Sequence, residues 1–192
     1  MVKCRIEDFN AWAERDGWET RVDGTLNFRS PKLKECLAVW TRAAAGKPLP
    51  MRADLTPRAM KTFLSSVIVW DVLGGESANR FRLRVMGSQP QRIWGGKAGD
   101  FIDEVVPEPF RARWHRIAQL CLDLRAPLRS HGIVQFANRT YFQSETFQAP
   151  LAGEGDAPDA ILFVHIVEPK AYLPAAPTGA GMPSHHARGS GP

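Results

Sequence analysis

The chain has 192 residues, a formal net charge of +5 at neutral pH and a hydrophobic fraction of 44%. This length fits one folded domain with additional terminal segments, and such a domain buries enough surface to form a hydrophobic core. The first residues lack the apolar segment of a signal peptide, and no apolar run reaches the about 18 residues that a membrane span needs. Three widely separated cysteines favour free thiols over disulfides or a zinc site. We therefore expect a cytoplasmic protein that binds no metal.

The N-terminal extension, residues 1–30, contains one short predicted helix. Ile6, Phe9 and Trp12 have helical spacing, and Gly17 follows them. Three bulky side chains, those of Phe9, Trp12 and Trp18, are more than a free tail would carry. We expect this extension to dock onto something rather than to form a free tail.

A longer helix is predicted over residues 31–45. Ser30 and Pro31 are favourable residues at a helix start, and Gly46 is favourable just after its end. Thr56 and Pro57 repeat the same start signal, so a second helix is expected through about residue 64.

Residues 66–72 are β-branched and apolar, and in residues 80–85 apolar side chains alternate with arginines. These patterns predict two strands that form an antiparallel hairpin. Residues 87–107 are rich in glycine and proline, which favours short helical turns around a cavity. Three further strands are predicted at residues 128–136, 140–150 and 160–167.

The helix that follows residue 107 has the clearest periodicity in the chain. Apolar side chains recur there at spacings of four, three, four and three, which places them on one helix face: Phe110, Trp114, Ile117, Cys121 and Leu124. A helix that leads directly into strands is typical of a small α+β domain whose helix lies on a sheet.

The last predicted strand, residues 161–167, is apolar on both faces. An antiparallel strand with one wet face would alternate instead. Either the helix of residues 31–45 or a second subunit must therefore cover the outer face of the sheet. Residues 171–192 consist mainly of small residues, proline and glycine, and we expect a disordered tail there.

The order of these elements is that of PAS domains, and the chain resembles the stand-alone PAS_5 family over about residues 31–169. The resemblance is carried by Trp40, Gly46 to Pro50, Arg52, Asp54, Pro57, Val67 to Asp71, Phe81 to Ser88, Gly99 and Phe101 to Asp103. Lys97 and Ala98 depart from the family pattern. The resemblance implies a five-stranded antiparallel sheet with helices packed on one face, forming a domain over residues 31–170. It also implies a sensory module that binds a small molecule or another protein, often as a dimer.

The cavity of such a domain would lie between the sheet and residues 87–107. Its expected lining residues are Trp94, Phe101, Trp114, Ile117 and His115. The alternative explanation for the aromatic side chains is ordinary core packing. A haem-binding PAS sensor would carry its iron on a histidine of the long helix, which makes His115 the residue to test, although three arginines crowd it. A flavin photosensor would need a reactive cysteine in a segment that contains none, and Cys121 is best explained as an apolar filler. We therefore predict no resident cofactor.

Two arginine clusters are candidate sites for an anion or an acidic partner, because the planar guanidinium suits phosphate and carboxylate groups. They are Arg80, Arg82 and Arg84 on a strand, and Arg111, Arg113 and Arg116 on the long helix. The alternative explanation is a solvated, partly salt-bridged surface. Basic and acidic residues are interspersed along the chain, and no nucleic-acid-docking motif is present, so nucleic acid is not the favoured partner.

No nucleophile, base or carboxylate pair stands at a spacing that indicates catalysis. The sequence therefore predicts a PAS-type regulatory module rather than an enzyme, acting through protein–protein contacts and a small ligand. The alternatives are an anion- or nucleic-acid-binding adaptor and a haem or flavin sensor. A dimer or docking face is predicted on the helix of residues 31–45, through Leu33, Leu37 and Trp40.

Overall fold

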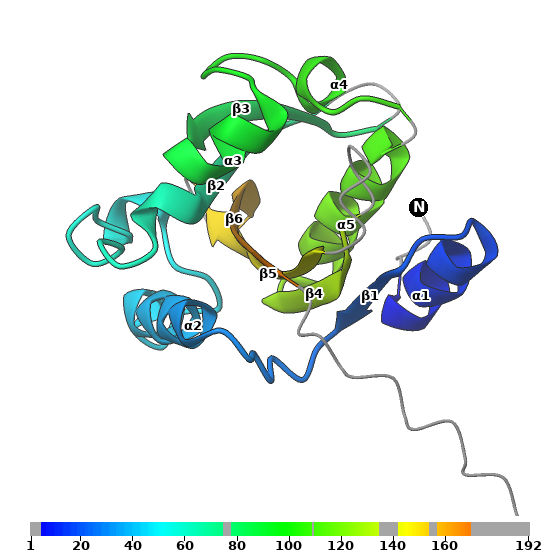
Figure 1. The fold of residues 1–192 in the computed structure, drawn as a ribbon. Coiled ribbons are helices and arrows are strands. Elements are labelled where there is room, and N and C mark those ends of the chain that lie inside the picture. Colours follow the sequence, from blue (N-terminus) through cyan, green and yellow to red (C-terminus); the bar gives the residue numbers. More distant parts are fainter. Residues whose placement is uncertain (1–4, 75–77, 109, 135–141, 154–156, 170–192) are drawn as a thin grey trace, which may run out of the picture.

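The computed structural model describes residues 5–74, 78–108, 110–134, 142–153 and 157–169, which form a six-stranded antiparallel sheet with helices on both faces (Figure 1). The helices are α1 (Ile6–Arg15), α2 (Pro31–Ala44), α3 (Ser88–Trp94), α4 (Ile102–Val105) and α5 (Phe110–Leu124). Short 3-10 turns lie at Arg52–Asp54 and Leu64–Ser66. The strands are β1 (Thr20–Asp23), β2 (Val67–Leu73), β3 (Arg80–Met86), β4 (Leu128–Ile133), β5 (Phe142–Ala152) and β6 (Pro158–Pro169). Their order across the sheet is β1-β4-β5-β6-β2-β3.

The sheet has one strand more than the five predicted, because the N-terminal extension adds β1 to one edge. Thr20 of β1 lies opposite Gly132 of β4. Glycine is required at this position, since a Cβ atom there would overlap the carbonyl oxygen of Glu19. The same oxygen accepts a 3.2 Å hydrogen bond from the backbone N–H of Ile133. With only four residues, β1 is too short for its alternation to stand out in the sequence.

The extension docks onto its own domain through α1. Phe9 and Trp12 are buried in the hydrophobic cluster that also contains the core side of α5. The Asn10 amide donates to the carbonyl of Val22 at 2.8 Å and accepts from its N–H at 2.9 Å. Residues 5–23 are therefore an integral part of the folded domain.

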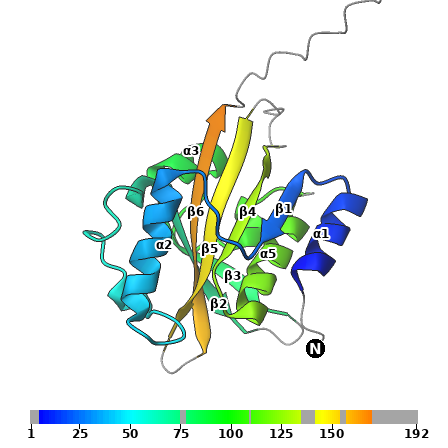
Figure 2. The same ribbon diagram turned by 90° about the horizontal axis from the view of Figure 1, so that it is seen from below.

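Helices cover both faces of the sheet, and not the single face expected. In Figure 2, α2 lies on one side of the strands and α5 on the other. We call the α5 side the inner face and the α2 side the outer face. Ile161 and Phe163 of β6 are buried in the inner cluster, whereas Leu162 and Val164 are buried in the outer one. This explains why β6 is apolar on both faces, and it confirms that the helix starting at Pro31 supplies the cover.

The predicted helix at residues 57–64 does not form. These residues make successive turns that end in the 3-10 turn Leu64–Ser66. Met60 and Phe63 are buried against the outer face while Leu64 is exposed, so the apolar side chains follow the contour of the sheet and not one helix face. The tail of residues 171–192 and the end of the strand predicted at 128–136 lie outside the described residues.

The long helix forms as predicted, as α5. Trp114, Ile117 and Cys121 are buried, and Leu124 at its end is exposed. Cys121 is fully buried and burial raises the pKa of its thiol, which fits an apolar filler.

Candidate functional site

A cavity of about 50 Å³ lies between α5 and the inner face of the sheet. One water molecule needs about 10–15 Å³ on this measure, so the cavity has room for a few waters or one small organic molecule. Strands β1, β4, β5 and β6 form its floor, and α3 and α5 form its walls.

The floor of the cavity is polar because neighbouring strands place polar side chains opposite one another. Ser130 of β4 lies opposite Thr146 of β5, and Thr146 lies opposite His165 of β6. Side chains two residues apart on a strand share a face, so Ser144 and Gln148 point to the same side as Thr146. All five side chains line the cavity. A sheet face packed beneath a helix normally carries apolar residues, so this polar row marks a site rather than ordinary core.

Aromatic and aliphatic side chains form the walls. Trp94 of α3 meets Trp114 of α5 edge to face, with ring centroids 5.7 Å apart. Trp114 in turn packs against Phe163 of β6, with ring centroids 5.6 Å apart. Ile117 and Ile133 complete the apolar wall. The cavity therefore has a polar floor and an apolar wall.

Among the described residues that line the cavity, Arg113 is the charged one. Its Nη1 donates a 3.0 Å hydrogen bond to the hydroxyl of Thr20, and its guanidinium lies over the rings of Trp18 and Phe110 at 4.8 and 5.5 Å. Burial lowers the pKa of Arg113 to about 10, so the side chain still carries its positive charge at neutral pH.

His165 lines the cavity as a neutral imidazole. Its Nδ1 lies 2.8 Å from the hydroxyl of Thr146. Burial, followed by the nearby positive charge of Arg113, lowers the pKa of His165 to about 4. The ring is therefore uncharged at neutral pH, and Arg113 remains the source of charge in the cavity.

Two buried donors that line the cavity have no hydrogen-bond partner among the described residues. They are Nε2 of Gln148, whose side chain is 1% exposed, and the indole Nε1 of Trp114. Most buried polar groups in proteins are hydrogen-bonded, and an unpaired one is costly. A hydrogen-bond acceptor in the cavity, a water molecule included, would satisfy these two donors.

The predicted lining residues are only partly brought together here. Trp94, Trp114 and Ile117 line the cavity, whereas Phe101 and His115 do not. Phe101 lies beneath the guanidinium of Arg80 at 3.8 Å. His115 projects from the flank of α5, where its Nε2 lies 2.7 Å from the carboxylate of Asp103, so it is not positioned as an axial ligand in this cavity.

Sequence analysis missed the polar floor. Ser144, Thr146 and Gln148 occupy every second position of β5, but Gln143 and Glu145 between them are also polar, so the sequence shows no clear alternation there. Which face of the sheet these three side chains occupy could not be derived from the sequence, because α2 and α5 cover opposite faces.

The two predicted arginine clusters do not form one anion site. Arg82 and Arg84 both pair with the buried carboxylate of Asp71 on the outer face of the sheet. Arg111 pairs with Glu108 at 3.2 Å, and Arg116 lies over the ring of Trp12 at 4.4 Å. Together with the contact between Arg80 and Phe101, these interactions match the alternative of a salt-bridged surface. Arg113 alone turns into the cavity.

The predicted dimer or docking face of α2 also needs correction. Leu33 and Trp40 are buried against the sheet of the same chain, and Leu37 is partly buried beside them. The indole N–H of Trp40 donates to the carbonyl of Pro150 at 3.2 Å. Leu33 and Trp40 are therefore not available to a second subunit, because the fold itself uses them.

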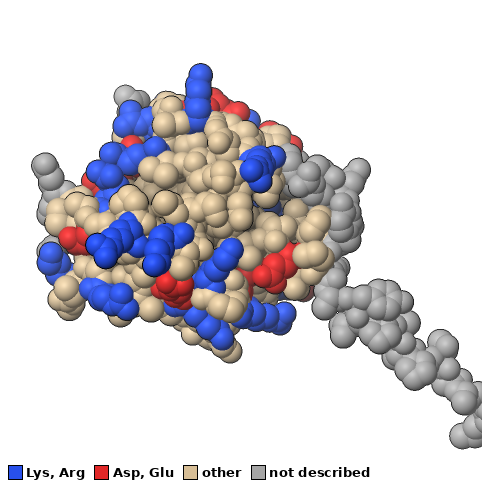
Figure 3. All heavy atoms as spheres, turned by 60° about the vertical axis from the view of Figure 1, so that its left-hand side comes forward, with Lys and Arg blue, Asp and Glu red and all other residues tan. Residues whose placement is uncertain are grey.

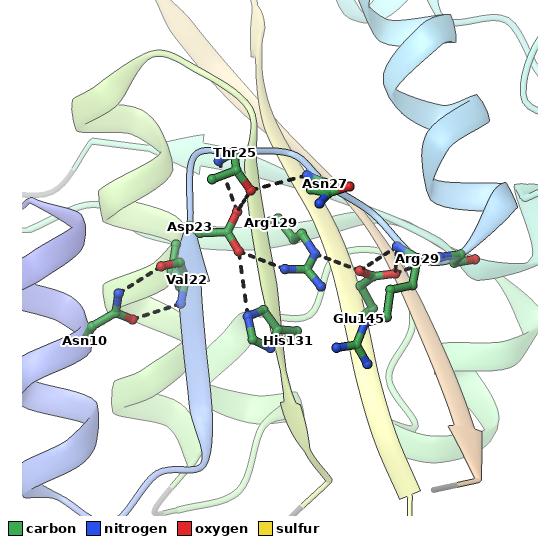
Figure 4. Close-up of polar contacts among 10 residues, drawn as sticks. Asn10, Val22, Asp23, Thr25, Asn27, Arg29, Arg129, His131 and Glu145 are labelled. Atoms are coloured by element: carbon green, nitrogen blue, oxygen red, sulfur yellow. Dashed lines mark hydrogen bonds and ion pairs between the residues drawn. The ribbon is translucent and has the colours of Figure 1, made fainter. Parts of the chain in front are cut away.

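A network of charges on the outer face holds β1 and the chain entering α2 in place (Figure 4). The buried guanidinium of Arg129 donates to Asp23 at 2.9 Å and to Glu145 at 2.7 Å. Glu145 also accepts the backbone N–H groups of Arg29 and Ser30 at 3.0 and 2.9 Å. These hydrogen bonds lower the pKa of Glu145 and of Asp23 despite their burial. The two carboxylates share one guanidinium, and Glu145 also binds the chain that enters α2, so these contacts fix β1 and that chain on the sheet.

Other classes of site find little support in the part of the chain that the structure describes. No group of three or more His, Cys, Asp or Glu side chains gathers as metal ligands there. Within the same residues, no helix has both the length and the apolar character to cross a membrane. Cys36 is buried, and burial raises the pKa of its thiol.

Comparisons with known proteins bear on the fold as a whole. Residues 28–164 match the family PAS_5, described as a PAS domain. Among solved structures, the chain is similar to the LOV protein of Rhodobacter sphaeroides, with 16% sequence identity and a TM-score of 0.38, over 59% of this chain and 68% of that one. No curated protein matches it significantly. Because the family match covers well over half of the chain, this protein belongs to the PAS_5 family of PAS domains.

Proposed function

We propose that this PAS domain is a sensory module in signal transduction, which binds a small molecule in the cavity beside α5 and acts through contacts with another protein. Family membership supports a sensory or signalling role. The ligand is supported by two buried donors that have no hydrogen-bond partner among the described residues: that of Gln148 in the polar sheet face and that of Trp114 on the helix above it. A ligand that satisfies them stabilises the packing of α5 on the sheet by mass action.

The cavity is connected to the N-terminal extension through Arg113. Its guanidinium joins the cavity lining to Thr20 of β1 and to the ring of Trp18. A ligand that contacts Arg113 can therefore shift the position of β1 and of the residues that precede it. This connection gives ligand binding a route to the molecular surface.

The partner surface of this proposal is the basic face formed by α2 and the segment that follows it, residues 31–66. Figure 3 shows Lys and Arg side chains outnumbering acidic ones on the side of the molecule where this segment lies. Two acidic residues, Glu35 and Asp54, accompany seven basic ones, and all seven are exposed and form no ion pair with the described residues. They are Lys32, Lys34, Arg42, Lys47, Arg52, Arg58 and Lys61. A face of this charge favours an acidic protein partner.

Native mass spectrometry of freshly purified protein tests the ligand. We expect a small-molecule adduct that Ile117→Phe removes, because the larger side chain fills the cavity. Ala112→Phe is the matched control, since it adds the same ring to an exposed position of α5. The proposal fails if both proteins carry no adduct, or if the adduct survives Ile117→Phe in a folded protein.

The partner surface is tested by reversing two of its charges, as in Arg58→Glu with Lys61→Glu. We expect this pair to abolish binding of an acidic partner protein. Charge reversal at Arg5 and Arg15 is the control, because these residues lie at opposite ends of α1, outside the basic face. Steeply salt-dependent binding of duplex DNA, lost with the same pair, would instead support the nucleic-acid-binding adaptor.

A further inference from the structure

We propose that the ligand of this cavity is a short-chain monocarboxylate with a small apolar body, held by Arg113 through its carboxylate group. This inference rests on the proposed function, because it names the chemical class of the ligand for the same cavity. It is carried by three features of the lining: its charge, its unpartnered donors and its size.

The charge of the lining selects an anion. Arg113 contributes a positive charge, His165 is neutral at neutral pH, and none of the described residues that line the cavity is Asp or Glu. Elsewhere in the described structure Arg82 and Arg129 meet carboxylates, but Arg113 forms no ion pair with any described residue. A half-buried guanidinium without a counterion is unfavourable, and a bound carboxylate would supply one.

The contacts of Arg113 leave room for such a pair. Trp18 and Phe110 contact its guanidinium as cation–π partners, and Thr20 takes one of its N–H groups. A guanidinium has five N–H donors in one plane, so in-plane donors remain. A carboxylate is the planar group that accepts two of them side by side.

The unpartnered donors also require acceptors on the ligand. Nε2 of Gln148 and Nε1 of Trp114 can only donate, and both line the cavity without a partner among the described residues. A cationic or wholly apolar ligand would leave them unpaired and would meet the charge of Arg113. Carboxylate oxygens satisfy both requirements, because each oxygen accepts more than one hydrogen bond.

The size of the cavity limits the rest of the molecule. A volume of about 50 Å³ corresponds to about four water molecules at 10–15 Å³ each, which fits a ligand of about four to six non-hydrogen atoms. Ile117, Ile133 and Phe163 provide an apolar wall for its hydrocarbon end. A nucleotide, a flavin or a haem is several times too large.

Titration of isotope-labelled protein with butyrate, followed by NMR, tests the proposal. Butyramide is the matched ligand, because it has the same shape without the charge. We expect butyrate to shift the indole N–H resonance of Trp114, which is identified by its loss in Trp114→Phe. We also expect butyrate to bind at least 10-fold more tightly than butyramide.

Substitution of the arginine tests its role. Arg113→Gln should weaken butyrate binding 10- to 100-fold and leave butyramide binding unchanged. Arg116→Gln is the matched control on the same helix, because Arg116 is exposed and lies over Trp12, away from the cavity. If Arg113→Gln does not fold, Gln148→Glu tests the same idea. It replaces the amide of Gln148 by a carboxylate of nearly the same shape, which should repel butyrate and leave butyramide binding unchanged.

Several results would overturn the carboxylate. One is that butyrate and butyramide bind equally tightly. Another is that Arg113→Gln or Gln148→Glu leaves butyrate binding unchanged. A third is that inorganic phosphate binds as tightly as butyrate. A neutral adduct in native mass spectrometry that Ile117→Phe removes, with no response to butyrate, would overturn the ligand class and leave the sensory function standing. Absence of both the adduct and any butyrate response would overturn both proposals.

Discussion

The two faces of the sheet treat buried polar groups in opposite ways. On the outer face, Arg129 is buried between Asp23 and Glu145, and every charge has a partner. On the inner face, Gln148 and Trp114 keep donors with no partner among the described residues. The same strands β4 and β5 supply both arrangements. Charged groups are thus paired on the outer face, whereas the inner face keeps the unsatisfied donors that support the proposed ligand site.

The largest effect is expected from Trp40→Ala, which removes the principal side chain between α2 and the outer face. Trp40 is buried and hydrogen-bonded to Pro150. Loss of such a side chain leaves a cavity, so the free energy of unfolding should fall by about 3–5 kcal/mol in urea titrations. Thr41→Ala, at the exposed neighbouring position, should change it by less than about 0.5 kcal/mol. A small effect of Trp40→Ala would mean that α2 does not seal this face.

Arg129→Met should come next, with a loss of about 3 kcal/mol in the same measurement. It leaves the carboxylates of Asp23 and Glu145 without their shared cation, and breaking a buried ion pair from one side is strongly destabilising. Arg21→Met is the control, because Arg21 forms an exposed ion pair with Glu14 that contributes little. Equal effects of the two substitutions would argue against a structural role for the network.

Acid should weaken the inner face before the outer one. The pKa of His165 falls from 6.5 to about 4 on folding, so between these pH values the unfolded chain binds a proton that the folded chain does not. The free energy of unfolding should therefore decrease by about 3 kcal/mol as pH drops through this range. His165→Gln should flatten this part of the curve, and His131, whose pKa is also lowered, adds a smaller slope of the same sign.

At still lower pH, the charge network of the outer face should lose its contribution to stability. The pKa values of Asp23 and Glu145 are lowered in the folded protein, so the stability that they contribute is lost only as pH falls below the ordinary carboxyl range. Unfolding measured by circular dichroism from pH 7 to pH 3 separates the two steps. An unchanged slope above pH 4 in His165→Gln would contradict this order.

The smallest effect is expected from Gln148→Leu on the inner face. This substitution removes a buried donor that has no partner among the described residues and keeps a similar volume. The free energy of unfolding should fall by no more than about 1 kcal/mol, and an increase is equally consistent with the argument. The test compares this change in the free energy of unfolding with that of Arg129→Met. If Gln148→Leu lowered it as much as Arg129→Met does, Gln148 would be a structural residue.

The local patterns of the sequence determined most of the elements. The spacing of Trp114, Ile117 and Cys121 defined α5, and the alternation of Phe81 and Leu83 with arginines defined β3. These patterns are local, because a helix face or a strand face is set by residues a few positions apart. The order of the elements and the motifs around Trp40 and Gly46 carried the resemblance to the PAS_5 family, and that resemblance placed three of the cavity-lining side chains.

Only the tertiary structure decided which residues far apart in the sequence come into contact. Thr20 and Arg113 are hydrogen-bonded although 93 positions separate them, and no local spacing links a short edge strand to the flank of a helix. Likewise, Leu33 and Trp40 had the pattern of a docking face, and the surface on which they dock proved to be the chain's own sheet. Amphipathic patterns specify that a face is buried, whereas its partner depends on long-range packing.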